Sequence, residues 1–218
     1  MIIGLVGNIG NGKGTVADIL VERHGYLKES FANSVKDACA AIFGWDRSML
    51  EGDTAESRVW REQPDEWWSK TLGKEFSPRL ALQLMGTEAG RNVFHPDLWV
   101  HTVLRRCSQK PESNYVIADV RFPNEINAIA EAGGKIVRVR RGVEPEWYNL
   151  ALECNLTGKQ EVMRNSYPEV HYSEWAWIGC HYDIVMDNNC SLDELRTRVD
   201  RLVDSVYNNR VEENEVVS

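Results

Sequence analysis

A glycine-rich segment directly after a short apolar run constrains this chain most. Residues 2–6 read Ile-Ile-Gly-Leu-Val, and the segment 7–15, Gly-Asn-Ile-Gly-Asn-Gly-Lys-Gly-Thr, follows at once. An apolar run that ends in glycines is typical of a buried strand entering a tight turn. Apolar residues then recur at helical spacing over 13–24, and Gly25 suits a C-cap. The sequence therefore predicts a strand, a tight loop and a helix in direct succession.

The loop between these elements has the composition of a phosphate-binding site. It fits the pattern GxxxxGK and has a hydroxyl residue, Thr15, two places after Lys13. Glycines let main-chain N–H groups point into one concavity, and the N-terminal end of the next helix favours an anion there. The alternative is a turn that only connects strand and helix. We expect the loop to bind ATP through these residues: Gly10, Asn11, Gly12, Lys13, Gly14 and Thr15.

The rest of the chain alternates between strand and helix patterns. Strands are predicted at 115–119, 136–139 and 183–186, and helices at 34–43, 78–91, 97–107, 124–132 and after a capping box at 191–194. This alternation favours an α/β fold, with a parallel sheet that has helices on both faces. The polar, tryptophan-rich residues 45–77 are expected to be an inserted lobe. The acidic segment 211–218 is expected to be disordered.

The charge balance limits the partners of the chain. The formal net charge is −8, from 33 acidic and 25 basic residues. Such a chain is a poor candidate for binding nucleic acid or a membrane surface. There is no apolar stretch of the roughly 18 residues that a membrane span needs, no basic leader, and no CxxC pair among five cysteines. We therefore expect a cytoplasmic protein without a nucleic-acid or membrane partner.

A carboxylate and a guanidinium follow the strand predicted at 115–119. Asp119 ends the strand, and Arg121 comes two residues later. A carboxylate at the carboxyl end of a strand beside a phosphate loop can orient Mg²⁺-bound water. Arg121 could then reach a phosphate in the same crevice. The alternative is an aspartate that caps a turn and an arginine at the surface.

The helix predicted at 78–91 has polar residues at every fourth position. Steps of four place Arg79, Gln83, Thr87 and Arg91 in one slowly winding stripe. Two guanidinium groups can bind a phosphate, and glutamine can bind a base edge. We expect this stripe to bind a phosphorylated substrate, with a solvated helix face as the alternative. Lys36, on the helix at 34–43, is a further candidate, although a single lysine is commonly a surface residue.

Histidine and tryptophan give two weaker signals. His95 and His101 stand six residues apart without a third partner, so we expect no metal site from them. Trp45, Trp60, Trp67 and Trp68 cluster in the lobe 45–77. One of the last two could stack on a base. The alternative is that the cluster forms the small core of the lobe or a dimer contact.

These motifs together resemble two groups of kinases. The ending Gly-Lys-Gly14-Thr puts glycine where most such loops have a serine or threonine that binds Mg²⁺, as in nucleoside monophosphate kinases of the adenylate kinase type. From residue 2 to about 206 the chain resembles the deoxynucleoside monophosphate kinases of tailed bacteriophages. The matching segments are 7–15, 31–37, 82–91, 96–99, 119–121 and 187–195.

The resemblance implies a three-layer P-loop kinase fold with an acceptor lobe and a lid. By position, the core would be 1–44, 78–141 and 181–210, the lobe 45–77 and the lid 142–180. Arg138, Arg140, Arg141 and Arg164 are the lid candidates, and a basic surface run is the alternative. The segment 171–174, His-x-Ser-Glu, resembles an element of related phage chains. Its role could be a hydrogen bond that stabilises the folded lid, or a contact with the substrate.

The resemblance also implies the reaction. The γ-phosphoryl group of ATP would pass to a deoxynucleoside monophosphate, and the product would supply phage DNA synthesis in the host cytoplasm. Lys13, Asp119, Arg121, Arg140 and Arg141 would be catalytic, and Trp99 would join the substrate site. Mg²⁺ would be held by Asp119 through water and by Thr15. A homodimer is possible in this family. The alternatives are a kinase of another phosphorylated metabolite, similar to phosphomevalonate kinase, and a non-catalytic nucleotide switch.

Overall fold

The computed structural model describes residues 1–216 of the chain, with side chains described through Tyr207. The chain forms two compact units. The first consists of Met1–Glu29 and Arg106–Ser218, and the second of Ser30–Arg105. Each unit has its own cluster of buried apolar residues, so each is described by itself.

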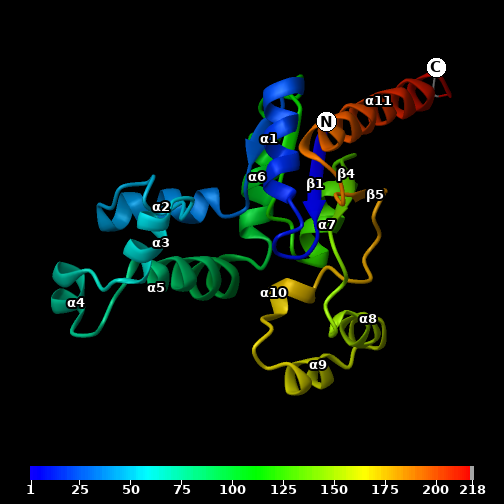
Figure 1. Cartoon of the computed structure of the whole chain (residues 1–218). Coiled ribbons are helices and arrows are strands. Elements are labelled where there is room, and N and C mark those ends of the chain that lie inside the picture. Colours follow the sequence, from blue (N-terminus) through cyan, green and yellow to red (C-terminus); the bar gives the residue numbers. More distant parts are fainter. Residues whose placement is uncertain (217–218) are drawn as a thin grey trace. The chain divides into compact units, whose positions relative to one another are not determined.

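A five-stranded sheet forms the centre of the first unit (Figure 1). The strands are β1 (Ile2–Val6), β2 (Leu27–Glu29), β3 (Tyr115–Ile117), β4 (Lys135–Arg140) and β5 (Ile184–Asp187). They are all parallel and follow the order β2-β3-β1-β4-β5. In the central strand, Gly4 pairs with Ile117 on one side and with Ile136 on the other. The α/β class predicted from the sequence is therefore confirmed.

Helices cover both faces of this sheet. On one face, α1 (Lys13–His24) and α11 (Leu192–Val216) share a core with Ile3 and Leu5 of β1. On the other face lies α7 (Pro123–Glu131), so close that a Cβ on Gly4 would come within 2.8 Å of Ile129 Cδ1. Glycine at position 4 thus allows a helix to approach the central strand. The predicted three layers are confirmed.

Strand β2 is not predicted by the sequence. Its three residues are Leu-Lys-Glu, and Leu27, which pairs with Tyr115 of β3, is 43% exposed. An edge strand needs to bury little, and charged side chains keep it from pairing with other chains. Such a segment lacks the apolar pattern from which a strand is predicted.

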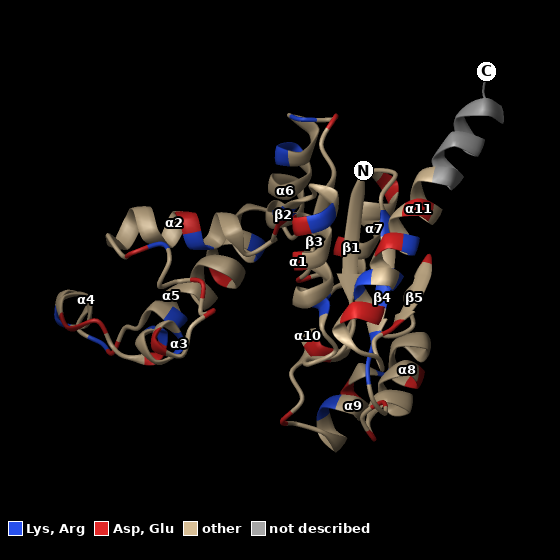
Figure 2. Cartoon of the chain, turned by 45° about the horizontal axis from the view of Figure 1, so that its top comes forward, with Lys and Arg blue, Asp and Glu red and all other residues tan. Residues whose placement is uncertain are grey.

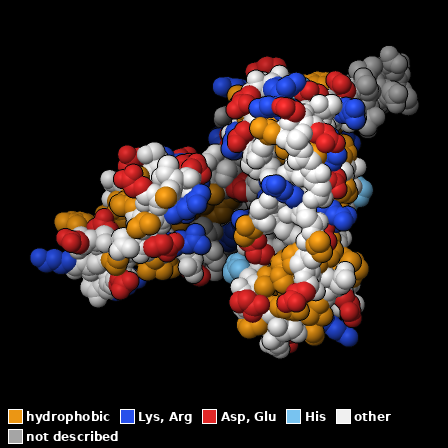
Figure 3. Space-filling model, viewed as in Figure 1, with side chains coloured by type: hydrophobic (Ala, Val, Ile, Leu, Met, Phe, Trp, Pro, Cys, Tyr) orange, Lys and Arg blue, Asp and Glu red, His pale blue; other side chains and the backbone are white. Residues whose placement is uncertain are grey.

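The segment between β4 and β5 contains three helices, α8 (Tyr148–Thr157), α9 (Gln160–Ser166) and α10 (Tyr172–Trp175). Trp175 is fully buried, whereas Leu156 and Val162 are exposed. Figure 3 shows hydrophobic side chains gathered on the surface of this segment. Its function as the lid predicted at 142–180 stays a prediction.

The last helix, α11, contains residues of both charge signs, which are coloured blue and red on its ribbon in Figure 2. The acidic segment 211–218, predicted to be disordered, lies at the end of this helix, and residues 217 and 218 are outside the described part of the chain. Among the described residues, no helix combines the length and the apolar character needed to cross a bilayer.

The second unit is helical. It contains α2 (Asn33–Phe43), α3 (Ala55–Glu62), α4 (Glu66–Leu72), α5 (Pro78–Gln83), the π-helix η1 (Leu84–Phe94) and the first part of α6 (Leu98–Ser108). The predicted lobe 45–77 lies inside this unit. Its role in binding an acceptor stays a prediction.

Tryptophans of the predicted lobe build the core of the second unit. The Trp45 ring stacks on Phe43 at 4.7 Å and meets Trp60 edge-on. The indole N–H groups also find acceptors: Trp45 donates to Asp65 at 2.8 Å, and Trp68 donates to the main-chain oxygen of Phe43 at 3.0 Å. Of the two interpretations of this cluster, the structure supports a small core for Trp45, Trp60 and Trp68, while Trp67 is 63% exposed.

The helix predicted at 78–91 is wound in two ways. Residues Pro78–Gln83 are α-helical, and the π-helix η1 follows at once. In a π-helix the hydrogen bonds run from i to i+5, so residues four apart no longer lie one above the other. The stripe expected from Arg79 to Arg91 therefore holds in α5 but not in η1.

Candidate active site

The phosphate loop joins β1 to α1, as predicted. Gly7 has φ of 142°, and a Cβ there would lie 2.3 Å from the main-chain oxygen of Val139 in β4. Gly12 has φ of 92°, and a Cβ there would lie 2.3 Å from Nδ2 of Asn188. Side chains at these two positions would meet both a strained backbone and an occupied space. The loop can thus keep this conformation only with glycine at both places.

Two buried asparagines hold the loop in place through hydrogen bonds to main-chain oxygens. Asn11 Nδ2 donates to the main-chain oxygen of Val139 at 3.1 Å, and Asn188 Nδ2 donates to the main-chain oxygen of Asn11 at 2.8 Å. Asn11 and Asn188 are 7% and 6% exposed. The Asn11 side chain therefore points into the protein, so the ATP contact predicted for this residue would have to come from its main chain. Gly10, Gly14 and Thr15, in contrast, are exposed.

Lys13 lies in the loop with its ammonium group held by main-chain oxygens. Nζ donates to Gly7 at 2.6 Å and to Asn8 at 2.9 Å. Burial and the charge of Arg121 lower the pKa of Lys13 to about 8, although the Glu174 carboxylate acts in the opposite direction. Lys13 is thus mainly protonated at neutral pH and is close enough to Arg121 to sense its charge.

Asp119 and Arg121 follow β3 at the same edge of the sheet as the loop. The register pairs Gly4 with Ile117, and two further steps bring Asp119 level with Val6, next to the loop. Arg121 Nη1 donates to Glu174 Oε1 at 2.6 Å. Arg121 thus stands on the loop side of the first unit, held by a residue of α10.

A buried glutamate shapes the turn at Arg121. Glu125 is 2% exposed, and its Oε2 accepts the main-chain N–H groups of Arg121, at 2.7 Å, and of Phe122, at 3.1 Å. This interaction caps α7 and fixes the main chain from which Arg121 projects. Sequence analysis missed Glu125, although its position three residues after a turn is typical of a capping box.

The arginines at the end of β4 differ in their surroundings. Arg138 is 14% exposed on its side chain, donates to Glu144 at 2.6 Å and lies among aromatic rings, with its Cζ 5.0 Å from the Tyr148 ring centroid and 5.3 Å from that of Trp177. Its guanidinium is therefore engaged inside the first unit. Arg140 and Arg141 are exposed, and Arg140 Nε lies 3.6 Å from Glu144.

Glu144 is a further residue that sequence analysis missed. Its Oε2 accepts from Asn8 Nδ2 at 3.0 Å, and its Oε1 accepts from Arg138. One carboxylate thus connects the phosphate loop to β4. No local pattern around position 144 indicates the contact with the loop, because Asn8 lies 136 residues away in the sequence.

Lys36 lies in the second unit. The alternative that it is an ordinary surface lysine does not hold, because its side chain is mostly buried. Its side chain is 14% exposed and pairs with Glu51, which also pairs with Arg47. Burial opposes ionisation of Glu51, but hydrogen bonds from Lys36 and Arg47 outweigh it, so the pKa of Glu51 lies below its ordinary value. Lys36 could bind a substrate phosphate only in exchange for this carboxylate.

Trp99 packs against two glycines of η1, the helix that also contains Thr87 and Arg91 of the predicted stripe. Trp99 is 8% exposed, and its Nε1 donates to the main-chain oxygen of Gly86 at 2.8 Å. Its ring covers Gly90, where a Cβ would lie 2.4 Å from a ring atom. Arg79, Gln83 and Thr87 are exposed and Arg91 is half-buried. The structure thus gives Trp99 a packing role, and substrate binding by these residues stays a prediction.

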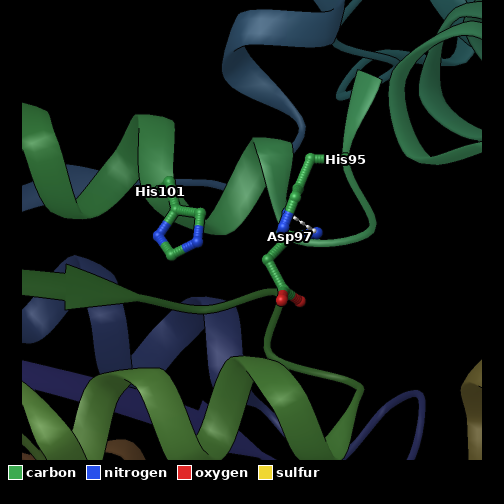
Figure 4. A group of neighbouring side chains, drawn as sticks. All are labelled: His95, Asp97 and His101. Carbon is green, nitrogen blue, oxygen red and sulfur yellow. Dashed lines mark hydrogen bonds between the residues drawn. The ribbon is translucent and has the colours of Figure 1, made fainter. Parts of the chain in front are cut away.

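The prediction that His95 and His101 lack a third partner is wrong. Asp97 completes the group, with ligand atoms of all three residues within 4.8 Å of one another (Figure 4). However, His95 Nδ1 accepts the main-chain N–H of Asp97 at 3.0 Å. A neutral ring then carries its proton on Nε2, so a metal would have to displace this hydrogen bond. We assign no metal to the group.

Two curated proteins resemble the chain, while no family model matches it. A protein of Acanthamoeba polyphaga mimivirus named "Putative deoxynucleotide monophosphate kinase" is 29% identical over 219 residues, which are 94% of this chain and 97% of that protein. The deoxynucleoside-5'-monophosphate kinase of Escherichia phage T5 is 42% identical over 55 residues, 25% of this chain and 22% of that protein.

Solved structures with a similar outline include two small-molecule kinases. Dephospho-CoA kinase from Campylobacter jejuni gives a TM-score of 0.49 at 14% identity, covering 96% of this chain and 98% of that chain. Shikimate kinase from Aquifex aeolicus gives 0.43 at 17% identity, covering 97% and 99%.

The curated relatives agree with the resemblance drawn from the sequence motifs. The likeness to the mimivirus protein covers nearly the whole chain, and a phosphate loop follows the central strand of the parallel sheet. Relatives with these names support a phosphotransferase enzyme. The chain is thus similar to proteins named as deoxynucleotide and deoxynucleoside monophosphate kinases, and its α/β fold places a loop with the GxxxxGK pattern after the central strand of a parallel sheet.

Proposed function

We propose that this chain transfers the γ-phosphoryl group of ATP to a deoxynucleoside 5'-monophosphate and so forms ADP and a deoxynucleoside diphosphate. The observation that carries this proposal is the likeness over 94% of the chain to a protein named for this class of substrate. It includes far more than the phosphate loop, which kinases of many substrates share. The product would supply DNA synthesis, in the host cytoplasm if the chain is encoded by a phage.

The chemistry requires positioning and charge neutralisation. An oxygen of the acceptor phosphate, already ionised at neutral pH, attacks the γ-phosphorus. The bond between the γ-phosphorus and the β–γ bridging oxygen breaks, and ADP leaves with the electron pair. No strong base is needed, so the protein acts mainly through its cationic groups and N–H donors.

The first unit supplies the donor side. Lys13 and the main-chain N–H groups of the loop would hold the β- and γ-phosphates, and Arg121 would meet a phosphoryl group. Asp119 and the exposed Thr15 offer oxygen atoms, the ligand type that Mg²⁺ prefers. Mg²⁺, when bound, would neutralise charge on the phosphates. The exposed Arg140 and Arg141 are the candidates for closing over the transferred group.

The second unit supplies the candidates for the acceptor. Arg79 and Arg91 would bind its phosphate, and Gln83 and Thr87 would bind its base or sugar. Arg91 is half-buried beside Gly90, whereas Arg79 is exposed and lies 4.0 Å from Glu62. Lys36 and Trp99 are further candidates, the first from its place on the helix predicted at 34–43 and the second from the resemblance to the phage kinases.

A coupled assay of ADP release tests the proposal. Wild type with ATP and Mg²⁺ is compared on dAMP, dGMP, dCMP, dTMP, AMP and phosphomevalonate. Turnover on one or more deoxynucleotides, with little on AMP, is expected, and Lys13→Met should lower kcat by about 100-fold or more while its thermal midpoint stays near that of wild type. Turnover on phosphomevalonate alone, or binding of ATP without any acceptor-dependent ADP, would overturn it.

A further inference from the structure

The guanidinium of Arg121 is held by one nitrogen. Nη1 donates to Glu174 Oε1 at 2.6 Å and lies 3.4 Å from Ser173 Oγ. Within the described part of the chain, Nε and Nη2 of Arg121 make no hydrogen bond. The edge of the guanidinium formed by Nε and Nη2 therefore stays open, on a side chain that is 42% exposed.

Two other arginines of the chain show how Nε and Nη2 together bind a carboxylate. Arg23 binds Asp200 through Nε at 3.2 Å and Nη2 at 2.8 Å. Arg106 binds Glu29 through Nε at 3.1 Å and Nη2 at 2.8 Å. In both pairs the two parallel donors hold two oxygens of one anion, the arrangement that also suits a phosphate. Glu174 holds Arg121 differently and leaves that arrangement available.

Both residues of the pair are fixed by other contacts. Glu125 fixes the main chain at Arg121, as described above. On the other side, α10 is secured by the buried Trp175, whose main-chain oxygen accepts from Asn155 Nδ2 at 2.8 Å, and its Tyr172 packs on Phe122. Glu174 is 21% exposed. The carboxylate thus comes from a rigid support and can orient the guanidinium.

Arg121 also lies on the same side of the first unit as the phosphate loop, because both follow neighbouring parallel strands at their carboxyl ends. Burial and, next to it, the charge of Arg121 lower the pKa of Lys13, as expected for two cationic groups near each other. Bringing two cations together is unfavourable without an anion. Glu174 supplies a charge of the opposite sign without occupying the open edge of Arg121.

We propose that Glu174, with Ser173, is a positioning residue that holds Arg121 by Nη1, so that Nε and Nη2 bind a phosphoryl group in a bidentate manner. This inference rests on the proposed function and gives a role to the segment His-x-Ser173-Glu174, for which sequence analysis leaves two options. His171 takes part indirectly, because its Nδ1 accepts the main-chain N–H of Ser173 at 3.2 Å and so caps α10.

A matched pair of substitutions separates positioning from charge. Glu174→Gln and Glu174→Met both remove the charge and have nearly the same size, but only glutamine can still accept a hydrogen bond from Nη1. Any effect of charge alone is therefore the same in both. Glu169→Gln and Glu169→Met, at an exposed position of the same segment, provide the control pair.

Binding of inorganic pyrophosphate by calorimetry is the first readout, because it needs no turnover. Glu174→Met should bind about five- to tenfold more weakly than Glu174→Gln, since it loses the oriented two-pronged contact. With Arg121→Ala in both backgrounds the difference should disappear. Equal affinities of the two variants with Arg121 present, or the same difference without Arg121, would overturn the proposal.

Turnover is the second readout. The kcat of Glu174→Met should fall about tenfold below that of Glu174→Gln, with the KM for the acceptor within about twofold. If wild type turns over none of the acceptors, the proposed function fails while the pyrophosphate comparison still decides the role of Glu174. Thermal midpoints verify folding, and Glu174→Ala replaces Glu174→Met in both comparisons if the latter does not fold.

Discussion

Asn188 and Asn11 stand 177 residues apart, yet the side-chain amide of one donates to the main-chain oxygen of the other at 2.8 Å. Both residues are almost fully buried, and the same amide fills the space that a Cβ on Gly12 would need. The residues after β5 thus set the conformation of a loop near the start of the chain.

Asn188→Ala should therefore damage both stability and nucleotide binding. It leaves the buried oxygen of Asn11 without its donor, which costs about 1–3 kcal/mol of unfolding free energy. The KM for ATP should rise because the loop loses its support. Urea unfolding and steady-state kinetics measure the two effects. Asn149→Ala, at an exposed position of α8, is the control, and equal behaviour of the two variants would contradict the prediction.

Binding of ATP should weaken as the pH rises through 8. The pKa of Lys13 is lowered to about 8 by burial and by Arg121, with Glu174 acting against them, so Lys13 is mainly charged at pH 7 and mainly neutral at pH 9. If only the charged form binds well, affinity should fall about tenfold between these values. Calorimetry in buffers of equal ionic strength measures this. Lys13→Met should bind weakly with a flat profile, and a steep fall in that variant would assign the titration to another group.

Arg91→Ala should affect the acceptor far more than ATP. A lost contact to the acceptor phosphate is expected to raise the KM for the deoxynucleotide at least about tenfold, with the KM for ATP within about twofold. Lys70→Ala, an exposed residue of α4 in the same unit, should leave both values unchanged. Equal rises in the two KM values would remove Arg91 from the acceptor site.

Two glycines of η1 should differ in their response to alanine. A Cβ on Gly90 would lie 2.4 Å from the Trp99 ring, whereas a Cβ on Gly86 would lie 3.7 Å from Val35, an ordinary contact. Gly90→Ala should therefore lower the unfolding free energy by about 1–3 kcal/mol through overpacking. Gly86→Ala should be neutral within about 1 kcal/mol. Denaturant unfolding followed by tryptophan fluorescence compares them, and similar losses would show that Trp99 does not confine Gly90.

The sequence predicts the elements that are specified by local signals. The run 2–6, the glycines after it and Gly25 define a strand, a loop and a helix, because apolar period and glycine conformation act over a few residues. The winding of η1 is different. It contains Gly86 and Gly90, both in contact with Trp99, which comes later in the chain. A local pattern cannot distinguish such a helix from an α-helix.

The candidate site divides in the same way. The sequence predicts Lys13 and Arg121 as site residues because each follows a strand that the sequence also predicts. Glu144 and Glu174 act through partners in other elements, so spacing alone does not indicate them. Asp97 is a different case, because it stands between His95 and His101 in the sequence itself, and the local spacing could have indicated it.

The strand order has a consequence for how the chain is made. Among the described residues, the partners of β1 in the sheet are the strands that begin at Tyr115 and Lys135, and Asn188, which secures the loop, comes later still. On the ribosome, β1 therefore cannot pair within the sheet until the residues from Tyr115 onward have been synthesised. Contacts of this sequence separation form slowly. A fragment that ends before Asn188 lacks the residue that secures the loop. Tight nucleotide binding by a nascent chain would thus report that synthesis has passed Asn188.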